Sequence, residues 1–161
     1  MATFKYNELG DLIEKNIHST NGGASFLQSI DYRYNARGWL QSINNPALNN
    51  DGSTNNDTND LFGAKYHYNS SFSVGGTSIP ARYDGAMAAF EWKNASVVGK
   101  TFNHSITGYL YDGLGQLTKA KYAAGNGTSW NLNQGDFDVD VAYEDYNGNI
   151  ASITRKSGGA S

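Results

Sequence analysis

Residues 4–12 read FKYNELGDL: an aromatic residue, any residue, Tyr, Asn, two further residues, Gly, one more residue and Leu. The same phrase returns as YRYNARGWL at residues 32–40 and as YLYDGLGQL at residues 109–117. Shorter variants read YDGAMAAF at residues 83–90 and YNGNIASI at residues 146–153. Five ordered copies of one phrase predict a protein built by stacking similar small units.

The phrase itself predicts a β-hairpin. Its two aromatic residues stand two apart, so they share one face of a strand that ends at the Tyr. The Asn or Asp opens a turn, the Gly supplies a positive φ, and the Leu or Ile starts the returning strand. These structural roles are assigned to Tyr6, Gly10, Tyr34, Gly38, Tyr83, Tyr111, Gly115, Tyr146 and Gly148.

A single hairpin is marginally stable in water, so the hairpins must pack side by side. We therefore expect an all-β fold of stacked antiparallel hairpins that forms a twisted, curled sheet or a partial β-shell. Residues 136–143, DFDVDVAY, add a strand by their strict alternation. This alternation predicts Phe137 and Val139 on one face and Asp138 and Asp140 on the outer face.

The chain is expected to form one domain over residues 1–156. The polar, Asn-rich segment 44–60 is predicted to be a surface insertion, and residues 157–161 a flexible tail added to a piece of a longer protein. The repeat turns are expected near residues 6–12, 34–40, 83–90, 111–117 and 146–153.

The composition excludes several classes of function. The 161 residues include 12 Lys+Arg and 15 Asp+Glu, and a net charge of −3 offers no basic surface for nucleic acid. With no cysteine, disulfides and thiol chemistry are excluded. No apolar run is long enough for a membrane-spanning helix, and no signal peptide is visible. We therefore expect neither a nucleic-acid nor a membrane partner.

The repeated phrase resembles the YD repeat of the Rhs family, which includes bacterial polymorphic-toxin shells, toxin-complex cocoon proteins and teneurins. The resemblance covers most of the chain and is carried by residues 6–10, 27–35, 37–40, 59–63 and 111–117. It implies a strip of antiparallel hairpins, which in longer relatives spirals into a hollow shell around a toxic cargo.

Two departures limit what the resemblance implies. Five repeats are too few to close such a shell. The Asp-Pro segment with an autoproteolytic aspartate has no counterpart, because neither Pro46 nor Pro80 follows an Asp. Cargo cleavage and cargo enclosure are therefore not expected of this chain.

The expected function is structural: a YD-repeat segment of an exported or cell-surface bacterial protein, which builds a β-wall or scaffold. Its expected partners are neighbouring YD repeats of a parent protein or a second copy of the chain. No catalysis and no cofactor are expected, since nucleophile-elbow, Walker and dinucleotide motifs are missing from the sequence. His18, His67 and His104 lie in separate repeats without metal-ligand spacing, and structural roles are predicted for them.

Two alternatives remain open. Within the polar insertion, alternating oxygen ligands form a weak calcium candidate, although it lacks the closing Glu of a calcium loop: Asn49, Asp51, Ser53, Asn55 and Asp57. The second alternative is a carbohydrate-binding module that uses exposed aromatic rings as sugar platforms. Its candidates are Trp39, Trp92 and Trp130, of which Trp130 lies outside the repeat phrase and is the best candidate for an exposed platform.

Overall fold

The computed structural model describes residues 1–49, 60–96, 98 and 103–158. Every regular element among these residues is a β-strand, which confirms the all-β prediction. None of the described residues belongs to a helix long and apolar enough to cross a lipid bilayer. The strands are β1 (Thr3–Tyr6), β2 (Leu12–Ile17), β3 (Gln28–Tyr34), β4 (Leu40–Ile43), β5 (Phe62–His67), β6 (Phe72–Val74), β7 (Thr77–Ile79), β8 (Ala89–Asn94), β9 (His104–Tyr111), β10 (Leu117–Gly125), β11 (Trp130–Leu132), β12 (Val139–Tyr143) and β13 (Ile150–Arg155).

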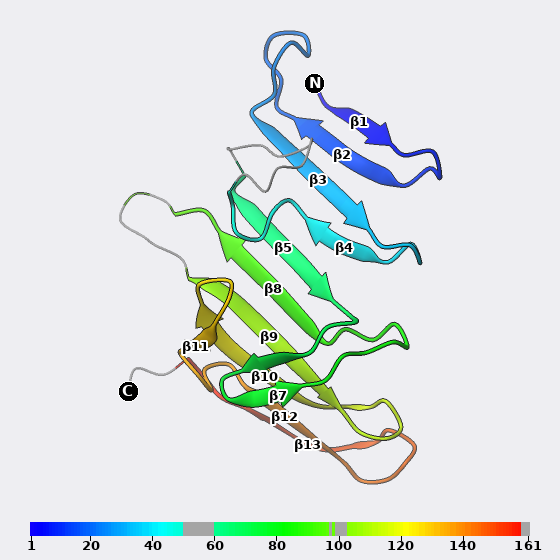
Figure 1. Ribbon diagram of the computed structural model, residues 1–161, viewed down its shortest axis with the longest axis vertical. Helices are drawn as coiled ribbons and strands as arrows, with labels where there is room; N and C mark the ends of the chain where they lie inside the picture. The colour runs from blue at the N-terminus through cyan, green and yellow to red at the C-terminus, as the bar shows by residue number, and fades with distance from the viewer. Residues whose placement is uncertain (50–59, 97, 99–102, 159–161) are drawn as a thin grey trace. The chain divides into compact units, whose positions relative to one another are not determined.

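Successive strands pair antiparallel in one long hydrogen-bonded order, β1-β2-β3-β4-β5-β8-β9-β10-β12-β13 (Figure 1). Strand β11 adds to β10 beside this path, and β6 and β7 form a separate two-stranded hairpin. The order ends at β1 and at β13, so among the described strands the sheet is open. Apart from the interruptions by β6–β7 and by β11, strands that are neighbours in the sequence are neighbours in the sheet, as stacked hairpins require.

The chain divides into two compact units, which are described separately. Unit 1 comprises Met1–Lys65 and Trp92–Phe102, and unit 2 comprises Tyr66–Glu91 and Asn103–Ser161. Strands β5 and β8 each contribute residues to both units.

The first repeat turn shows how the phrase folds. The Oδ1 atom of Asn7 accepts hydrogen bonds from the backbone N–H groups of Leu9, at 2.9 Å, and of Asp11, at 2.8 Å. The N–H of Gly10 donates to the Asn7 carbonyl oxygen at 3.1 Å, and Gly10 has a φ of +89°. Asn is favoured at the start of this turn because its side-chain oxygen accepts backbone N–H groups of the turn.

The same turn recurs in two further repeats. In each, the side-chain oxygen of the Asn or Asp accepts from the backbone N–H groups two and four residues later, at 2.9–3.1 Å: Asn35 from Arg37 and Trp39, and Asp112 from Leu114 and Gln116. Gly38 and Gly115 have φ values of +76° and +81°. These values confirm the predicted positive φ of the repeat glycines. Glycine is favoured at these positions because an L side chain would be strained there.

The last hairpin corrects the assignment of Tyr146. Tyr143 pairs with Ile150 across the hairpin, so Tyr143, and not Tyr146, ends the strand. Tyr146 lies inside the turn with 89% of its surface exposed. This turn is one residue longer than the turn between Tyr6 and Leu12, which shifts the Tyr-Asn-Gly phrase away from the strand end. Gly148 still has a positive φ of +85°.

The assignment of Tyr83 to a strand end is also wrong. Tyr83 lies between β7 and β8 and is 66% exposed. Pro80 follows β7 directly and has no backbone N–H for pairing, so the strand stops before it reaches Tyr83. The residues ahead of Tyr83 instead form the β6–β7 hairpin.

The predicted outer-face position of Asp138 is wrong. The alternation breaks at Phe137, which has a φ of +58°, and β12 begins only at Val139. Asp138 is consequently turned inward, with 1% of its surface exposed. Its carboxylate pairs with Lys121 and accepts the backbone N–H of Tyr122 at 2.9 Å, so the buried charge is compensated.

Unit 1 buries mainly polar side chains. Its centre is Asn44, whose backbone N–H donates to the Asp31 carbonyl at 2.8 Å and whose Oδ1 accepts from the Asp31 N–H at 2.7 Å. The Asn44 Nδ2 donates to the carbonyl oxygen of Phe62 at 2.8 Å. One side chain thereby connects β3 to β5, and the side chain of Glu14 in β2 pairs with Lys5 of β1 at 2.7 Å.

Unit 2 contains the hydrophobic core. The β6–β7 hairpin packs as a second layer on β9, and β6 also contacts β10 and β11 (Figure 1). The fully or nearly buried residues of this core are Val74, Ile79, Ala88, Ala89, Ile106, Ala123 and Trp130. Small residues on the sheet let the hairpin approach closely, since a larger side chain would hold the two layers apart.

Gly108 sets the distance between these layers, and its replacement by Ala should be destabilising. An added Cβ at Gly108 would lie 2.5 Å from Ile79 Cγ1 and 3.2 Å from Val74 Cγ2. We expect Gly108→Ala to lower the free energy of unfolding by about 1–3 kcal/mol, because the hairpin must shift outward. Urea unfolding measures this change. Gly113→Ala is the matched control, because an added Cβ there meets nothing within 4 Å, and an equal loss in both variants would contradict the prediction.

Candidate functional site

Three ionisable side chains from separate strands meet inside unit 2. The Oε2 atom of Glu91, in β8, lies 2.7 Å from Nε2 of His67, in β5. Its Oε1 atom lies 2.8 Å from Nε2 of His104, in β9. One carboxylate thus lies against two imidazoles, and we call these three residues the His–Glu–His cluster.

The His–Glu–His cluster is buried. Glu91, His67 and His104 expose 7%, 8% and 5% of their surfaces. The ring of Phe72 packs edge-on against His67 with centroids 4.5 Å apart, and Trp130 packs edge-on against His104 at 5.0 Å. These rings exclude water from the cluster, which strengthens its electrostatic interactions.

The loop that follows β10 approaches His104 through Gly127. A Cβ at Gly127 would lie 3.0 Å from His104 Nδ1, and the residue has a φ of +92°. Glycine is therefore favoured at this position, because the backbone is left-handed and because a side chain would collide with the imidazole. The loop covers the side of the His104 ring that does not face Glu91.

The two imidazoles control the charge of Glu91. Burial by itself raises the pKa of the Glu91 carboxyl, but the contacts with His104 and His67 outweigh it and lower the pKa to about 2. Glu91 is therefore ionised at neutral pH. The contact with His67 has good hydrogen-bond geometry, whereas His104 Nε2, although close, makes no well-aligned hydrogen bond, so its contact is mainly electrostatic.

The cluster links its three strands through one carboxylate. Both Nε2 atoms face the carboxylate instead of a shared open position. Within the described ranges, no group of three His, Cys, Asp or Glu side chains is placed to hold a metal ion. Removing one partner of such a buried ionic network leaves an uncompensated charge inside the fold.

The aromatic platform candidates are placed differently from the prediction. Trp130, the best candidate for an exposed platform, is only 7% exposed and belongs to the hydrophobic core, where it packs on His104. The short strand β11 pairs with β10, and its first residue, Trp130, is buried. The repeat phrase does not predict this strand. Trp39 and Trp92 are half-buried, and the guanidinium of Arg37 lies 5.0 Å from the centroid of the Trp39 ring.

Two other candidate groups are not brought together into a site. Of the calcium candidates, Asn49 is described, whereas Asp51, Ser53, Asn55 and Asp57 lie outside the described residues. The exposed His18, at a φ of +62°, has no part in the His–Glu–His cluster.

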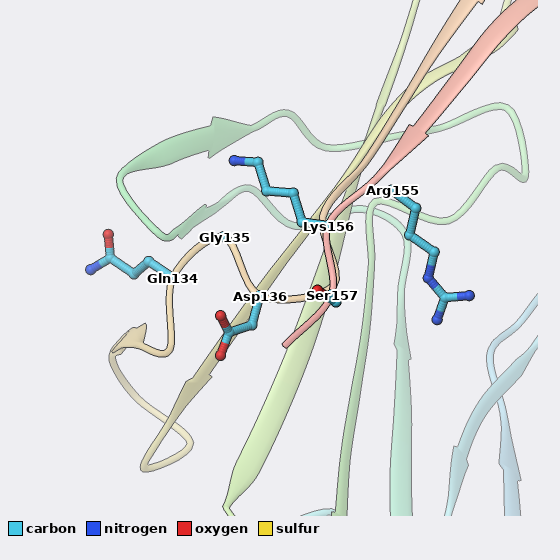
Figure 2. A pocket seen from close by; sticks show the side chains of 6 residues that line it. All are labelled: Gln134, Gly135, Asp136, Arg155, Lys156 and Ser157. Carbon is cyan, nitrogen blue, oxygen red and sulfur yellow. The ribbon is translucent and has the colours of Figure 1, made fainter. Parts of the chain in front are cut away.

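Two shallow hollows lie among the described residues of unit 2. One, of about 500 Å³, is lined by residues 134–136 and 155–157. Figure 2 shows the side chains of Gln134, Arg155 and Lys156 pointing in different directions from this hollow. The other, of about 320 Å³, is lined by residues 81–84, where Arg82 pairs with Asp84 and lies 4.6 Å from the Tyr111 ring centroid.

Comparison with protein family models and with curated protein sequences gives no match.

The sequence analysis did not find the His–Glu–His cluster, because its members are far apart in the chain. One signal was available: residues 66–69 read YHYN, the same Tyr-x-Tyr-Asn start as residues 32–35. This copy lacks the following Gly and Leu, so it was not counted among the repeats. Recognising it would have placed His67 on a strand that ends at Tyr68.

The His–Glu–His cluster predicts a dependence of stability on acid pH. Because the pKa of Glu91 is lower in the folded chain than its ordinary value of 4.5, its ionised form stabilises the fold above pH 4.5. This contribution, on the order of 3 kcal/mol, should be lost as the pH falls from about 4.5 to 2. Urea unfolding across this pH range measures it.

Glu91→Gln should flatten this part of the pH profile, since the amide has no charge to lose. The control is Glu8→Gln, which changes an exposed carboxylate in the first turn and should keep the wild-type slope. A Glu91→Gln profile as steep as that of the wild type would show that another group causes the acid sensitivity.

Proposed function

We propose that the chain is a structural repeat segment of an exported or cell-surface protein, which forms a β-wall or scaffold and has no catalysis of its own. The observation that carries this proposal is a hydrogen bond from a Tyr hydroxyl to the preceding part of the array, which is seen at three places. The Tyr34 hydroxyl donates to the carbonyl oxygen of Leu12 at 3.1 Å. The Tyr143 hydroxyl donates to the carbonyl oxygen of Leu117 at 2.9 Å.

Donor and acceptor hold the same positions in both cases. The donor is the Tyr at which the strand of one hairpin ends. The acceptor is the Leu that starts the returning strand of the hairpin before it. The Tyr111 hydroxyl makes a similar bond, at 2.9 Å, but its acceptor is the carbonyl oxygen of Met87, two residues ahead of β8. In these three cases a Tyr at the end of a strand joins its hairpin to the preceding part of the array.

Such a bond is what a stacked array needs for its stability. In repeat proteins the interface between neighbouring units adds to the intrinsic stability of each unit. The side chains that the phrase repeats form turns and junctions, and the long polar side chains that line the hollow of about 500 Å³ point in different directions (Figure 2). The chemistry-bearing residues of the described regions thus support a role in building a surface.

The export and the bacterial parent protein are proposed from the resemblance to the YD repeats of the Rhs family. Neighbouring YD repeats or a second copy of the chain would then be its partners. The rival function, a carbohydrate-binding module, loses its main support because Trp130 lies in the core.

Removing the junction hydroxyl should destabilise the array. We expect Tyr34→Phe and Tyr143→Phe each to lower the free energy of unfolding by about 0.5–1.5 kcal/mol, because each leaves a backbone carbonyl without this donor. Hydrogen exchange should also become faster at the strand ends beside Leu12 and Leu117. Tyr6→Phe is the matched control, since the Tyr6 hydroxyl makes no hydrogen bond within the described part of the chain. Equal stability of all three variants would refute the junction role.

A binding experiment separates the scaffold from its rival. In affinity electrophoresis through gels that contain plant or bacterial polysaccharides, we expect the chain to migrate as it does in plain gels. Retardation that is lost in Trp39→Ala or Trp92→Ala, with an unchanged circular dichroism spectrum, would instead favour the carbohydrate-binding module.

A further inference from the structure

The hairpins stack in a fixed register, first seen between β2 and β3. Glu14, two residues after Leu12, lies opposite Asp31, three residues before Tyr34. The register can therefore be stated in repeat positions: the second residue after the Leu pairs with the third residue before the next Tyr.

The same register recurs in unit 2 between β10 and β12. Lys119, two residues after Leu117, lies opposite Asp140, three residues before Tyr143. At this junction, as at the first, the Tyr hydroxyl reaches the carbonyl oxygen of the Leu.

A third junction agrees. Ser42, two residues after Leu40, lies opposite Lys65. Lys65 stands three residues before Tyr68, the Tyr of the YHYN copy. Three junctions thus share one pairing rule, so the rule belongs to the repeat and not to a particular pair of strands.

The two end strands carry the halves of this junction that have no partner strand among the described residues. At the first end, Phe4 and Tyr6 are 50% and 60% exposed, and no described residue accepts from the Tyr6 hydroxyl. At the other end every residue of β13 is exposed, with Ile150 at 52% and Ile153 at 60%. Ile150 holds the position that Leu12 and Leu117 hold in their hairpins.

We propose that β13 of one copy pairs with β1 of a second copy, head to tail, in the register of the internal junctions. This inference rests on the proposed structural function. Counting as in the internal junctions places Ser152 opposite Thr3 and Ile153 opposite Ala2 of the second copy. The Tyr6 hydroxyl of that copy then donates to the Ile150 carbonyl oxygen. Two different surfaces meet, so the contact is heterologous and can propagate into chains of copies.

Charge on β1 does not oppose this pairing. Lysine on an edge strand commonly discourages association, and Lys5 stands directly before Tyr6. However, Arg33 holds the same position directly before Tyr34 inside the array, so a cation is accommodated at this position of a junction. Lys5 is moreover neutralised by Glu14 of its own copy, at 2.7 Å. The second copy is thus an occupant whose charges fit.

The hydrogen-bonding groups of β13 point in the required direction. The Lys156 N–H donates to the Asp138 carbonyl oxygen at 2.9 Å, and antiparallel strands alternate inward and outward along their length. Ser152 and Thr154 therefore direct their N–H groups to β12. Ile153 and Arg155 direct theirs away from it, to the edge that the second copy would occupy.

Sedimentation equilibrium across a concentration series tests the pairing with two variants that each block one end. Ile153→Pro removes an outward N–H of β13 and leaves the bonds to β12 intact. Ala2→Pro blocks the facing position on β1. We expect the wild-type chain to form oligomers with increasing concentration and each variant alone to remain monomeric. An equimolar mixture of the two should form a one-to-one dimer, because one free head meets one free tail.

Two further variants refine the test. Arg155→Pro is the matched control, because its outward N–H would lie beyond Met1 of the second copy, and it should associate as the wild type does. Tyr6→Phe should weaken association by about threefold to tenfold without a change in the stability of the monomer.

The following results would overturn the inference: a wild-type chain that stays monomeric, dimers of Ile153→Pro alone, or association that is insensitive to Tyr6→Phe. None of them bears on the proposed function, whose test is the loss of stability in Tyr34→Phe and Tyr143→Phe within one copy.

Discussion

The fold depends on one short-range interaction: a side-chain oxygen of Asn7, Asn35 or Asp112 that accepts two backbone N–H groups inside its repeat turn. At Asn7 and Asp112 this oxygen binds the second and fourth following residues, and the intervening Gly adopts a positive φ. A β-bulge follows the turn: Tyr6 pairs with Leu12, but Lys5 pairs with Glu14, so one residue of the second strand has no partner in the first. This fixed offset brings the carbonyl oxygen of the Leu within reach of the next Tyr hydroxyl, and the array follows from it.

Local interactions were predictable from the sequence, and packing was not. The turns of the repeats that begin at Phe4, Tyr32 and Tyr109 follow from the Asx-Gly spacing, because each needs only residues within the turn. Tyr146 was misassigned because the last turn is one residue longer, which preserves the Tyr-Asn-Gly letters but moves them off the strand. The second layer of unit 2 depends on Gly108 and Ile79, which are far apart in sequence, so no local pattern predicts it.

The His–Glu–His cluster was unpredictable for the same reason. His67, Glu91 and His104 come from three strands whose adjacency depends on an excursion of the chain through the β6–β7 hairpin. The excursion also explains the misassignment of Tyr83, which lies on the way back to β8. Trp130 could not be recognised as a core residue, because its burial requires β11 to pair with β10 and to lie against His104.

The two units use different sources of stability on one repeated plan. Unit 2 buries aliphatic side chains and Trp130 under the β6–β7 hairpin, and it holds a buried carboxylate between two imidazoles. Unit 1 buries polar groups such as Asn44, Asp31 and Glu14, whose hydrogen bonds add less than apolar burial does. In a repeat array, units that gain little from their own core depend more on the junctions with their neighbours. The Tyr hydroxyl bond therefore matters most where the core is weakest, and the unused donor at Tyr6 lies in that same polar unit.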